Sequence, residues 1–324
     1  MRQQRGAALL LAMLTVALVA TIAAAALWQQ WRAAEVEAAE RQRLQASWIL
    51  VGALDWARLI LREDARSNQN SGAADHLGEP WATPLEEARL SSFLAADKNN
   101  SAEELMPAFL SGDVTDLQSR LNVYNLVRMS GNGTQAKAEI SAPDMASFTR
   151  LFALLNLPQA ELNAAASNLL KSTEQAMNDP KPSDSPLLPQ RYAQLRWLGL
   201  SERTLAALKA HVTVLPERTT LNLNTASAEA LSASIAGLDL ALAQQVVGAR
   251  AITPFNDIKG AIARIPGASE RTVTSQTHDV RSRFFEVRAR LRLDDTLIEE
   301  RSLVQRNGLS TQVRWRERVP AAGP

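Results

Sequence analysis

The sequence contains no cysteine. This absence excludes disulfide bonds, thiol chemistry and every metal site built on cysteine ligands. The chain also lacks an excess of charge of either sign, because 35 Lys and Arg residues face 34 Asp and Glu residues, for a formal net charge of +1 over 324 residues. A dedicated polyanion-binding protein normally shows a basic excess or a basic stripe. The overall charge therefore argues against nucleic-acid binding as the main activity.

Short motifs of common catalytic sites are missing as well. The chain has no G-x-S-x-G segment, no Walker loop and no H-E-x-x-H segment. Its three histidines, His76, His211 and His278, are too far apart in the sequence to form a local metal motif, and His211 lies within a helical pattern that favours a structural role. These absences predict that the protein is not an enzyme.

The N-terminus has the pattern of a membrane anchor. The first six residues, MRQQRG, carry two arginines and no acid, and the 22 residues 7–28 that follow carry no charge. As a helix at about 1.5 Å per residue, such a run spans roughly 33 Å, which is enough to cross the core of a bilayer. The basic leader is expected to stay on the cytoplasmic side, so that the rest of the chain emerges on the other side.

A cleavable secretory signal peptide is the main alternative for this segment. Its apolar region usually runs for 7–15 residues and ends at a small-residue cleavage site. Here the apolar run is longer, and the chain continues as a helical pattern without proline through residues 29–64. That continuation is amphipathic and predicts a helix whose apolar side packs against partner helices. The residues near this side are Leu44, Trp48, Val51, Trp56 and Leu59.

Strand patterns occur on both sides of a helical region. Residues 67–118 are mixed and polar, and a short strand is expected around Leu121 and Val123. Residues 144–278 contain successive helical patterns, with helix-starting residues at Asp144 and Ser201. Residues 284–293 then alternate apolar and charged side chains, as in a half-buried strand, and two further strands follow after turns at 294–295 and 306–308. A helical block is therefore expected as an insertion in one αβ domain.

The clearest internal motif is the helical segment that starts LNLNTAS at residue 221. Two tight turns, Ile235-Ala236-Gly237-Leu238 and Ile265-Pro266-Gly267, separate its helices, as in helix-hairpin-helix domains, some of which bind DNA. DNA binding at such turns needs Lys or Arg to meet phosphates. Residues 222–280 hold four basic residues and five acids, a balance of −1. The acids are Glu229, Asp239, Asp257, Glu270 and Asp279. We therefore expect a module that packs against protein.

The order of these motifs resembles one family of secretion proteins. Arg5-Gly6-Ala7 with the apolar helix behind it is similar to the leader of type IV pilins and type II secretion pseudopilins. Most members of that group have a glutamate at the fifth mature position, where this chain has Leu11. An apolar residue there suits a subunit with no neighbour above it, because an unpaired carboxylate in the membrane is costly. The leader, HLGEPWATP, LNLNTAS, SRFFEVRARLRL and RSLVQR together resemble the K-type minor pseudopilin (GspK) family.

This resemblance implies an α+β fold. It consists of a long N-terminal transmembrane pilin helix, an antiparallel-sheet pseudopilin domain and a large all-α insertion of the helix-hairpin-helix or SAM-like type. The expected segments are 1–6 (prepilin leader), 7–28 (transmembrane helix), 29–66 (periplasmic continuation of the helix), 67–143 (first part of the αβ domain), 144–280 (α-helical insertion), 281–316 (C-terminal β-meander) and 317–324 (tail).

The resemblance also implies a function at the tip of a periplasmic pseudopilus, in support of protein secretion across the outer membrane. The chain would be anchored in the inner membrane, cut by prepilin peptidase between Gly6 and Ala7, and N-methylated at Ala7. Its partners would be the I-type and J-type minor pseudopilins, with an H-type subunit below, and no nucleic acid. No cofactor is expected except calcium, for which the family's acidic cluster is lost here and only Glu174, Asp179 and Asp184 remain.

Two alternatives stay open at the level of the sequence. A minor pilin of a type IV pilus assembly system would share the same leader and helix. A membrane-anchored DNA receptor would use the helix-hairpin-helix turns, against the charge balance given above.

Overall fold

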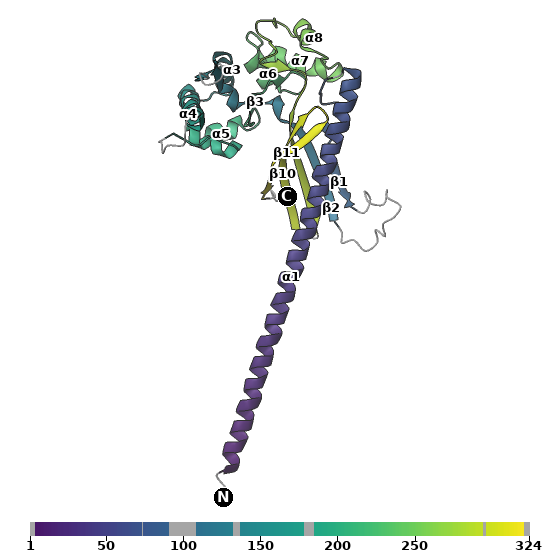
Figure 1. The fold of residues 1–324 in the computed structure, drawn as a ribbon, viewed down its shortest axis with the longest axis vertical. Helices are drawn as coiled ribbons and strands as arrows, with labels where there is room; N and C mark the ends of the chain where they lie inside the picture. Colours follow the sequence, from purple (N-terminus) through teal and green to yellow (C-terminus); the bar gives the residue numbers. More distant parts are fainter. Residues whose placement is uncertain are drawn as a thin grey trace. The chain divides into compact units, whose positions relative to one another are not determined.

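The computed structural model describes residues 4–72, 74–90, 108–131, 137–177, 185–293 and 296–320. The chain divides into two compact units, Met1–Ala53 and Leu54–Pro324. The first consists of the greater part of one helix, and the second contains the sheet and the remaining helices labelled in Figure 1.

Helix α1 (Gln4–Ser71) runs for 68 residues without interruption, as its pattern predicts. The helix is long and apolar enough to cross a membrane, and no part of its most apolar segment is buried. The threonines of this segment donate their hydroxyls back to the helix, Thr15 to the Ala12 carbonyl at 2.9 Å and Thr21 to the Leu18 carbonyl at 2.8 Å. Such bonds are needed where no water can satisfy a polar group.

The second unit is built on one five-stranded antiparallel sheet, in the order β1-β2-β9-β10-β11. Two of its strands precede the helical block in the sequence and three follow it, so the β2–β9 pairing closes the sheet across that insertion. The strands are β1 (Leu85–Arg89), β2 (Ala108–Asp116), β9 (Phe284–Leu293), β10 (Thr296–Asn307) and β11 (Ser310–Val319).

The alternation predicted for β9 is confirmed, because Phe285, Val287, Ala289, Leu291 and Leu293 are buried while the charged residues between them are half-buried. The C-terminal part of α1 packs on this side of the sheet. Its contribution to the shared core is Leu54, Ala57 and Leu61, against Trp81, Phe285, Val287 and Val304. The rings of Trp81 and Phe285 meet edge to face, with centroids 5.2 Å apart, a favourable aromatic geometry.

The helical block lies between β5 (Lys137–Ile140) and β8 (His278–Asp279) and has its own hydrophobic core, which includes Phe152, Leu169, Leu231 and Phe255. Its helices are α3 (Ala142–Leu154), α4 (Gln159–Met177), α5 (Glu202–Leu208), α6 (Ala228–Ser234), α7 (Leu240–Ile252) and α8 (Ile258–Arg264).

Short elements lie before the sheet, between the sheet and the helical block, and within the block. Their bounds are η1 (Pro80–Ala82), η3 (Leu117–Ser119), η4 (Val123–Leu126) and η6 (Tyr192–Leu198) for the 3-10 helices, and β3 (Leu121–Asn122), β4 (Val127–Ser130), β6 (Val212–Thr213) and β7 (Leu221–Asn222) for the strands. β3 pairs with β6 and β7 with β8, both in parallel, whereas β4 and β5 are antiparallel.

The predicted hairpin turns are present. Gly237 (φ 88°) and Gly267 (φ 75°) both adopt the left-handed conformation that glycine takes without strain. Helix α6 begins after Ser227, whose hydroxyl accepts from the Ala230 amide at 3.2 Å, and α5 begins after Ser201, which accepts from the Thr204 amide at 3.3 Å. The LNLNTAS segment therefore enters its helix through a serine cap.

Three local predictions differ from the structure. Asp144 does not start a helix: α3 begins at Ala142 after Ser141, and Asp144 lies in the first turn, where its carboxylate accepts from the Ser141 hydroxyl at 2.5 Å. Leu121 lies in a strand of only two residues, and Val123 already belongs to a 3-10 helix. The strands within 67–118 were missed, because β1 has a mostly exposed, polar sequence and the apolar residues of β2 are interrupted by Ser111, Gly112 and Asp113. The turn at 294–295 lies outside the described residues.

Gly112 gives a test of the sheet. A Cβ at this position would lie 2.5 Å from the Arg288 carbonyl of β9, too close for any side chain. We expect Gly112→Ala to lower the free energy of unfolding by about 1–3 kcal/mol, since β2 would have to move away from β9. Denaturant unfolding of the full chain in an uncharged detergent measures this. Gly248→Ala is the control: nothing lies within 4 Å of that Cβ on α7, so no loss is expected there. Equal stability of both variants would contradict the close β2–β9 packing.

Candidate functional site

The side of α1 predicted to meet partner helices is exposed. Leu44 is 60% exposed, Trp48 73%, and Trp56 and Leu59 44% each, whereas Val51 is half-buried. At about 100° per residue, Leu44, Trp48 and Val51 of the first unit fall within an arc of roughly 60°, and Trp56 and Leu59 of the second lie roughly 60° apart. We call Leu44, Trp48, Trp56 and Leu59 the outward face of α1. Within the second unit, the residues that pack on the sheet, Leu54, Ala57 and Leu61, lie on the other side of the helix.

Exposed aromatic and aliphatic side chains in such a row are unusual for a surface that meets only water. Trp in particular is enriched at the centres of protein interfaces. The outward face therefore has the chemistry of an assembly surface, and its geometry on a rigid helix suits packing against other helices.

The processing residues lie in the first turns of α1. Gly6 and Ala7 are within the helix, which begins at Gln4, and Leu11 is exposed among other apolar residues. Residues 1–3 lie outside the described part of the chain. Cleavage after Gly6 and methylation of Ala7 stay predictions.

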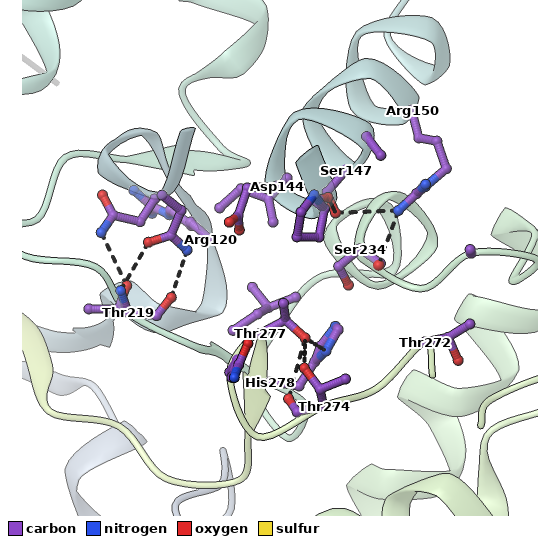
Figure 2. Close-up of a pocket in the computed structure, with 18 of the residues that line it drawn as sticks. Arg120, Asp144, Ser147, Arg150, Thr219, Ser234, Thr272, Thr274, Thr277 and His278 are labelled. Carbon is purple, nitrogen blue, oxygen red and sulfur yellow. Dashed lines mark hydrogen bonds between the residues drawn. The ribbon is translucent and has the colours of Figure 1, made fainter. Parts of the chain in front are cut away.

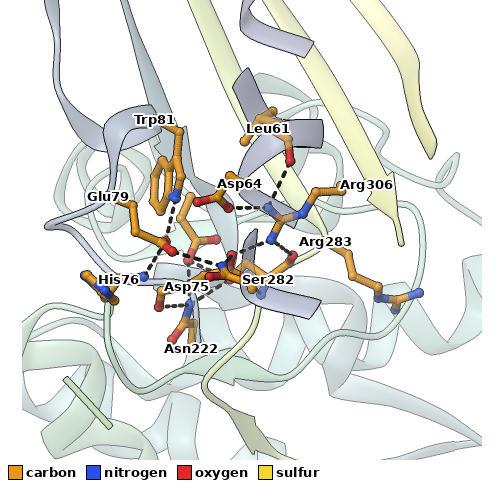
Figure 3. A network of polar contacts seen from close by, with 12 residues as sticks. Leu61, Asp64, Asp75, His76, Glu79, Trp81, Asn222, Ser282, Arg283 and Arg306 are labelled. Carbon is orange, nitrogen blue, oxygen red and sulfur yellow. Dashed lines mark hydrogen bonds and ion pairs between the residues drawn. The ribbon is translucent and has the colours of Figure 1, made fainter. Parts of the chain in front are cut away.

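A buried polar network, which we call the junction, ties α1 to the sheet and to the insertion (Figure 3). At its centre Arg306, from the end of β10, donates to Asp64 of α1 at 2.7 Å and to Asp75 at 2.5 Å. It also donates to the Leu61 carbonyl at 3.3 Å and to the Ser282 carbonyl at 3.0 Å. All of these side chains are buried.

The HLGEPWATP segment joins the same network through Glu79. One carboxylate oxygen of Glu79 accepts from the Trp81 indole at 2.7 Å and from the His76 amide at 2.9 Å, and the other accepts from Asn68 of α1 at 2.9 Å. Trp81 in turn fills the core under the helix. The glutamate therefore fixes both the loop and the large aromatic side chain that follows it.

The LNLNTAS segment joins the junction through Asp116, at the end of β2. The Oδ2 of Asp116 accepts from Thr225 at 2.5 Å, from Ser282 at 2.6 Å and from the Asn222 amide group at 3.1 Å, while its Oδ1 accepts from the Gln118 backbone at 2.8 Å. The Oδ1 of Asn222 also accepts a hydrogen bond from the Asn224 backbone amide at 2.9 Å. These side chains therefore dock the first hairpin of the insertion onto the sheet.

Burial dominates the electrostatics of the junction. Desolvation, with the nearby Glu79 charge, raises the pKa of Asp64 to about 7, against the opposing Arg306. Desolvation also raises the pKa of Asp116 to about 6. Burial by itself disfavours a charged Arg306, but Asp75 and Asp64 outweigh it, so that the pKa of Arg306 lies above its ordinary value. The junction thus has one buried cation among several acids.

Within the described residues, the one group with the spacing of a metal site is Asp64, Asp75 and Glu79, whose ligand atoms lie within 4.8 Å of one another. Arg306 supplies a positive charge to two of them, and both oxygens of Asp75 and of Glu79 already accept hydrogen bonds. The arrangement is that of a structural ion-pair network. Of the predicted calcium residues, Glu174 is half-buried on α4, and Asp179 and Asp184 lie outside the described residues, so calcium binding by these three residues stays a prediction.

The basic residues of the helix-hairpin-helix segment are partly committed to the fold. Arg250 is buried and donates to the carbonyls of Leu223 and Ala226, and burial lowers the pKa of Arg250 to about 10. Arg264 stacks on Phe255 with its guanidinium 4.7 Å from the ring centre. Two of the four basic side chains that could contact phosphates, Arg250 and Arg264, therefore make contacts within the fold instead.

Sequence reasoning found Asn222 and Thr225 as part of a motif but did not find Asp64, Asp75, Asp116, Ser282 or Arg306 as a group. Two of the quoted motifs contain residues of the junction or its surroundings: HLGEPWATP contains Glu79 and Trp81, and RSLVQR ends in Arg306. The five residues come from five segments, and no spacing in the sequence shows that they meet.

Comparison with known proteins gives a consistent result. The family model "Type II secretion system (T2SS), protein K" matches residues 221–281, which include the two hairpins and the Asn222 end of the junction. The chain is 26% identical over 311 residues to Type II secretion system protein K of Pseudomonas aeruginosa, covering 91% of this chain and 86% of that protein. It is also 26% identical over 331 residues to the protein of the same name from Klebsiella pneumoniae, covering 94% of each.

The fold is similar to that of a chain in the crystal structure of the GspK-GspI-GspJ complex from the enterotoxigenic Escherichia coli type 2 secretion system. The TM-score is 0.66 with 18% sequence identity, over 87% of this chain and 99% of that chain. The α+β fold expected from the sequence is therefore confirmed.

Breaking the junction is expected to be costly. Arg306→Gln would leave Asp64 and Asp75 buried without their cation, so we expect a loss of about 3–5 kcal/mol in the free energy of unfolding. Denaturant unfolding of the full chain in an uncharged detergent measures the loss. Arg314→Gln, an exposed position on the neighbouring strand β11, is the matched control and should change stability by less than about 0.5 kcal/mol. Similar losses in both variants would show that the junction does not carry the stability.

The junction also predicts a pH dependence. The folded chain holds the proton of Asp64 more tightly than the unfolded chain, so this stabilisation is complete below about pH 3.8 and is lost as the pH rises towards 7. His278 acts in the opposite direction, since burial lowers the pKa of His278 from 6.5 to about 4 and its contribution is lost as the pH falls through that range.

Asp64→Asn separates the two effects, because asparagine mimics the neutral carboxyl group. Between pH 5 and 7 the unfolding free energy of this variant should fall less steeply with rising pH than that of the wild type. The difference in slope should correspond to at most about one bound proton. Asp55→Asn, at an exposed carboxylate on the same helix, should keep the wild-type slope. An unchanged slope in Asp64→Asn would contradict the raised pKa.

Proposed function

Since the chain belongs to the type II secretion system protein K family, we propose that it is a minor pseudopilin that forms the tip of a periplasmic pseudopilus. The observation that carries this proposal is the outward face of α1 on a helix long and apolar enough to act as a single-pass membrane anchor. A pilin-like subunit assembles through such helices, and a chain that met no partner would gain nothing from exposing two tryptophans there.

The proposed partners are subunits of the I and J types. The related structure is a complex of GspK with GspI and GspJ, and the shared fold supports the same arrangement for this chain. We infer that the outward face of α1 contacts these partners, and that an H-type subunit follows below. Leu11 at the fifth mature position supports a subunit with nothing above it, and the bulky helical block supports a cap.

The basic leader and the apolar helix support our proposal that the chain is anchored in the inner membrane with the second unit in the periplasm. Prepilin peptidase would cut between Gly6 and Ala7 and leave a methylated Ala7. A structural role rather than catalysis is proposed. The family match favours type II secretion over the type IV pilus alternative, and the internal use of Arg250 and Arg264 gives no support to a DNA receptor.

Co-purification tests the proposal. The full-length chain would be co-expressed with the I-type and J-type pseudopilins of its own system and isolated in an uncharged detergent. We expect a stable complex, and we expect Trp48→Glu to reduce its recovery by roughly tenfold or more, as for a buried tryptophan at an interface.

Ile252→Glu is the matched control, because Ile252 is 87% exposed at the end of α7, away from α1 in the sequence. This variant should retain both partners. A complex that survives Trp48→Glu unchanged would place the interface elsewhere, and the absence of any complex with correctly folded wild-type subunits would count against the tip assignment.

A further inference from the structure

A cavity of about 330 Å³ lies within the second unit, among α3, the β3–η4 segment and the segment 271–278 (Figure 2). Most of the residues that line it have polar side chains, many of them hydroxyls or amides. They include Ser147, Ser234, Thr219, Thr272, Thr274, Thr277, Asn122 and Asn125. The junction does not use this cavity, and neither does the outward face of α1.

Positive charge dominates the walls. Three arginines line the cavity, Arg120, Arg150 and Arg271, together with one acid, Asp144. That acid is already neutralised from outside the lining, since Arg218 donates to it at 2.7 Å. The three lining guanidinium groups are therefore not offset by any other carboxylate among the described lining residues.

Two of these arginines have no protein partner. Within the described part of the chain, the side chains of Arg120 and Arg271 make no hydrogen bond or ion pair. Arg150 is held in place by neutral groups, donating to the Ala233 carbonyl at 2.6 Å and to the Ser234 carbonyl at 3.2 Å. Its position is fixed while its charge remains available to a ligand.

A buried histidine adds an unsatisfied polar atom at the same place. His278 lines the cavity, is only 1% exposed, and bonds through Nδ1 to the Thr277 hydroxyl at 2.8 Å. Its Nε2 has no hydrogen-bond partner among the described residues. Buried polar atoms are rarely left without a partner. Burial, with the charge of Arg150, lowers the pKa of His278 to about 4, so the ring is neutral at neutral pH.

We propose that this cavity binds a small multivalent oxyanion of the phosphate class. A single guanidinium group suffices for the two coplanar oxygens of a carboxylate. Here the lining contains three arginines from three segments, Arg120 from the turn after η3, Arg150 from α3 and Arg271 from the segment after α8. A ligand with three or more acceptor oxygens and about two negative charges matches this set, and the lining hydroxyls supply further donors.

The first experiment is calorimetric titration of the full chain, in an uncharged detergent and an oxyanion-free buffer of low ionic strength. Inorganic phosphate is expected to bind with one-site stoichiometry, and acetate at least about tenfold more weakly. Glycerol 3-phosphate distinguishes the source of the group: binding equal to or tighter than that of inorganic phosphate indicates a phosphate carried by a larger molecule, and weaker binding a free ion. Absence of phosphate binding, or equal binding of acetate, would overturn the proposal.

The second experiment uses variants that the fold tolerates. Arg271→Gln changes an exposed side chain without protein partners and should weaken phosphate binding roughly tenfold, and the Arg120→Gln/Arg271→Gln double variant should lose binding further. Arg203→Gln, an exposed arginine on α5 outside the lining, should bind as the wild type does. Equal weakening by Arg203→Gln would show that only the overall charge matters, which would also overturn the proposal.

Discussion

One buried cation, Arg306, links the end of α1, the loop that follows it and the sheet of the second unit. Arg306 at the end of β10 is paired with Asp64 of α1 and with Asp75 of the following loop. Both carboxylates are buried, and neither could remain charged there without a partner. Since Asp75 also accepts from the Ser282 amide at the start of β9, the same guanidinium group links the helix, the loop and the sheet. A pilin helix and its sheet are thus held by charge as well as by apolar packing.

Asparagines extend this arrangement into the insertion. Asn222 connects Asp116 and Ser282 to the first hairpin, Asn224 exchanges two hydrogen bonds of 2.8 Å with the Phe255 backbone, and Asn125 exchanges two with that of Thr219. An amide side chain can donate and accept at once, so it can replace a strand partner where two irregular segments meet. The insertion therefore docks through short polar contacts rather than through a continuous sheet.

Much of the fold was predictable from local pattern. The apolar run and the amphipathic repeat behind it determine α1, strict alternation determines β9, and the glycines at 237 and 267 determine the hairpin turns. The residues predicted to pack against partner helices are exposed, apart from half-buried Val51, and that packing stays a prediction. The strands β1 and β2 were missed because their sequence has no strong alternation, and only pairing with β9 makes them strands. Gly112 shows this dependence, because a side chain at this position is excluded by the Arg288 carbonyl, 176 residues later in the chain.

The sequence by itself determined which segment is long and apolar enough to cross a membrane, which segments repeat as helices and which alternate as strands, because those properties depend on residues close together in the chain. The tertiary structure alone decided that Asp64, Asp75, Asp116, Asn222 and Arg306 form one junction, and that Arg120, Arg150 and Arg271 surround one cavity. An isolated acid or arginine in a sequence looks like a solvated surface residue. Its burial, and with it the pKa and the role of the group, depends on side chains brought from distant segments.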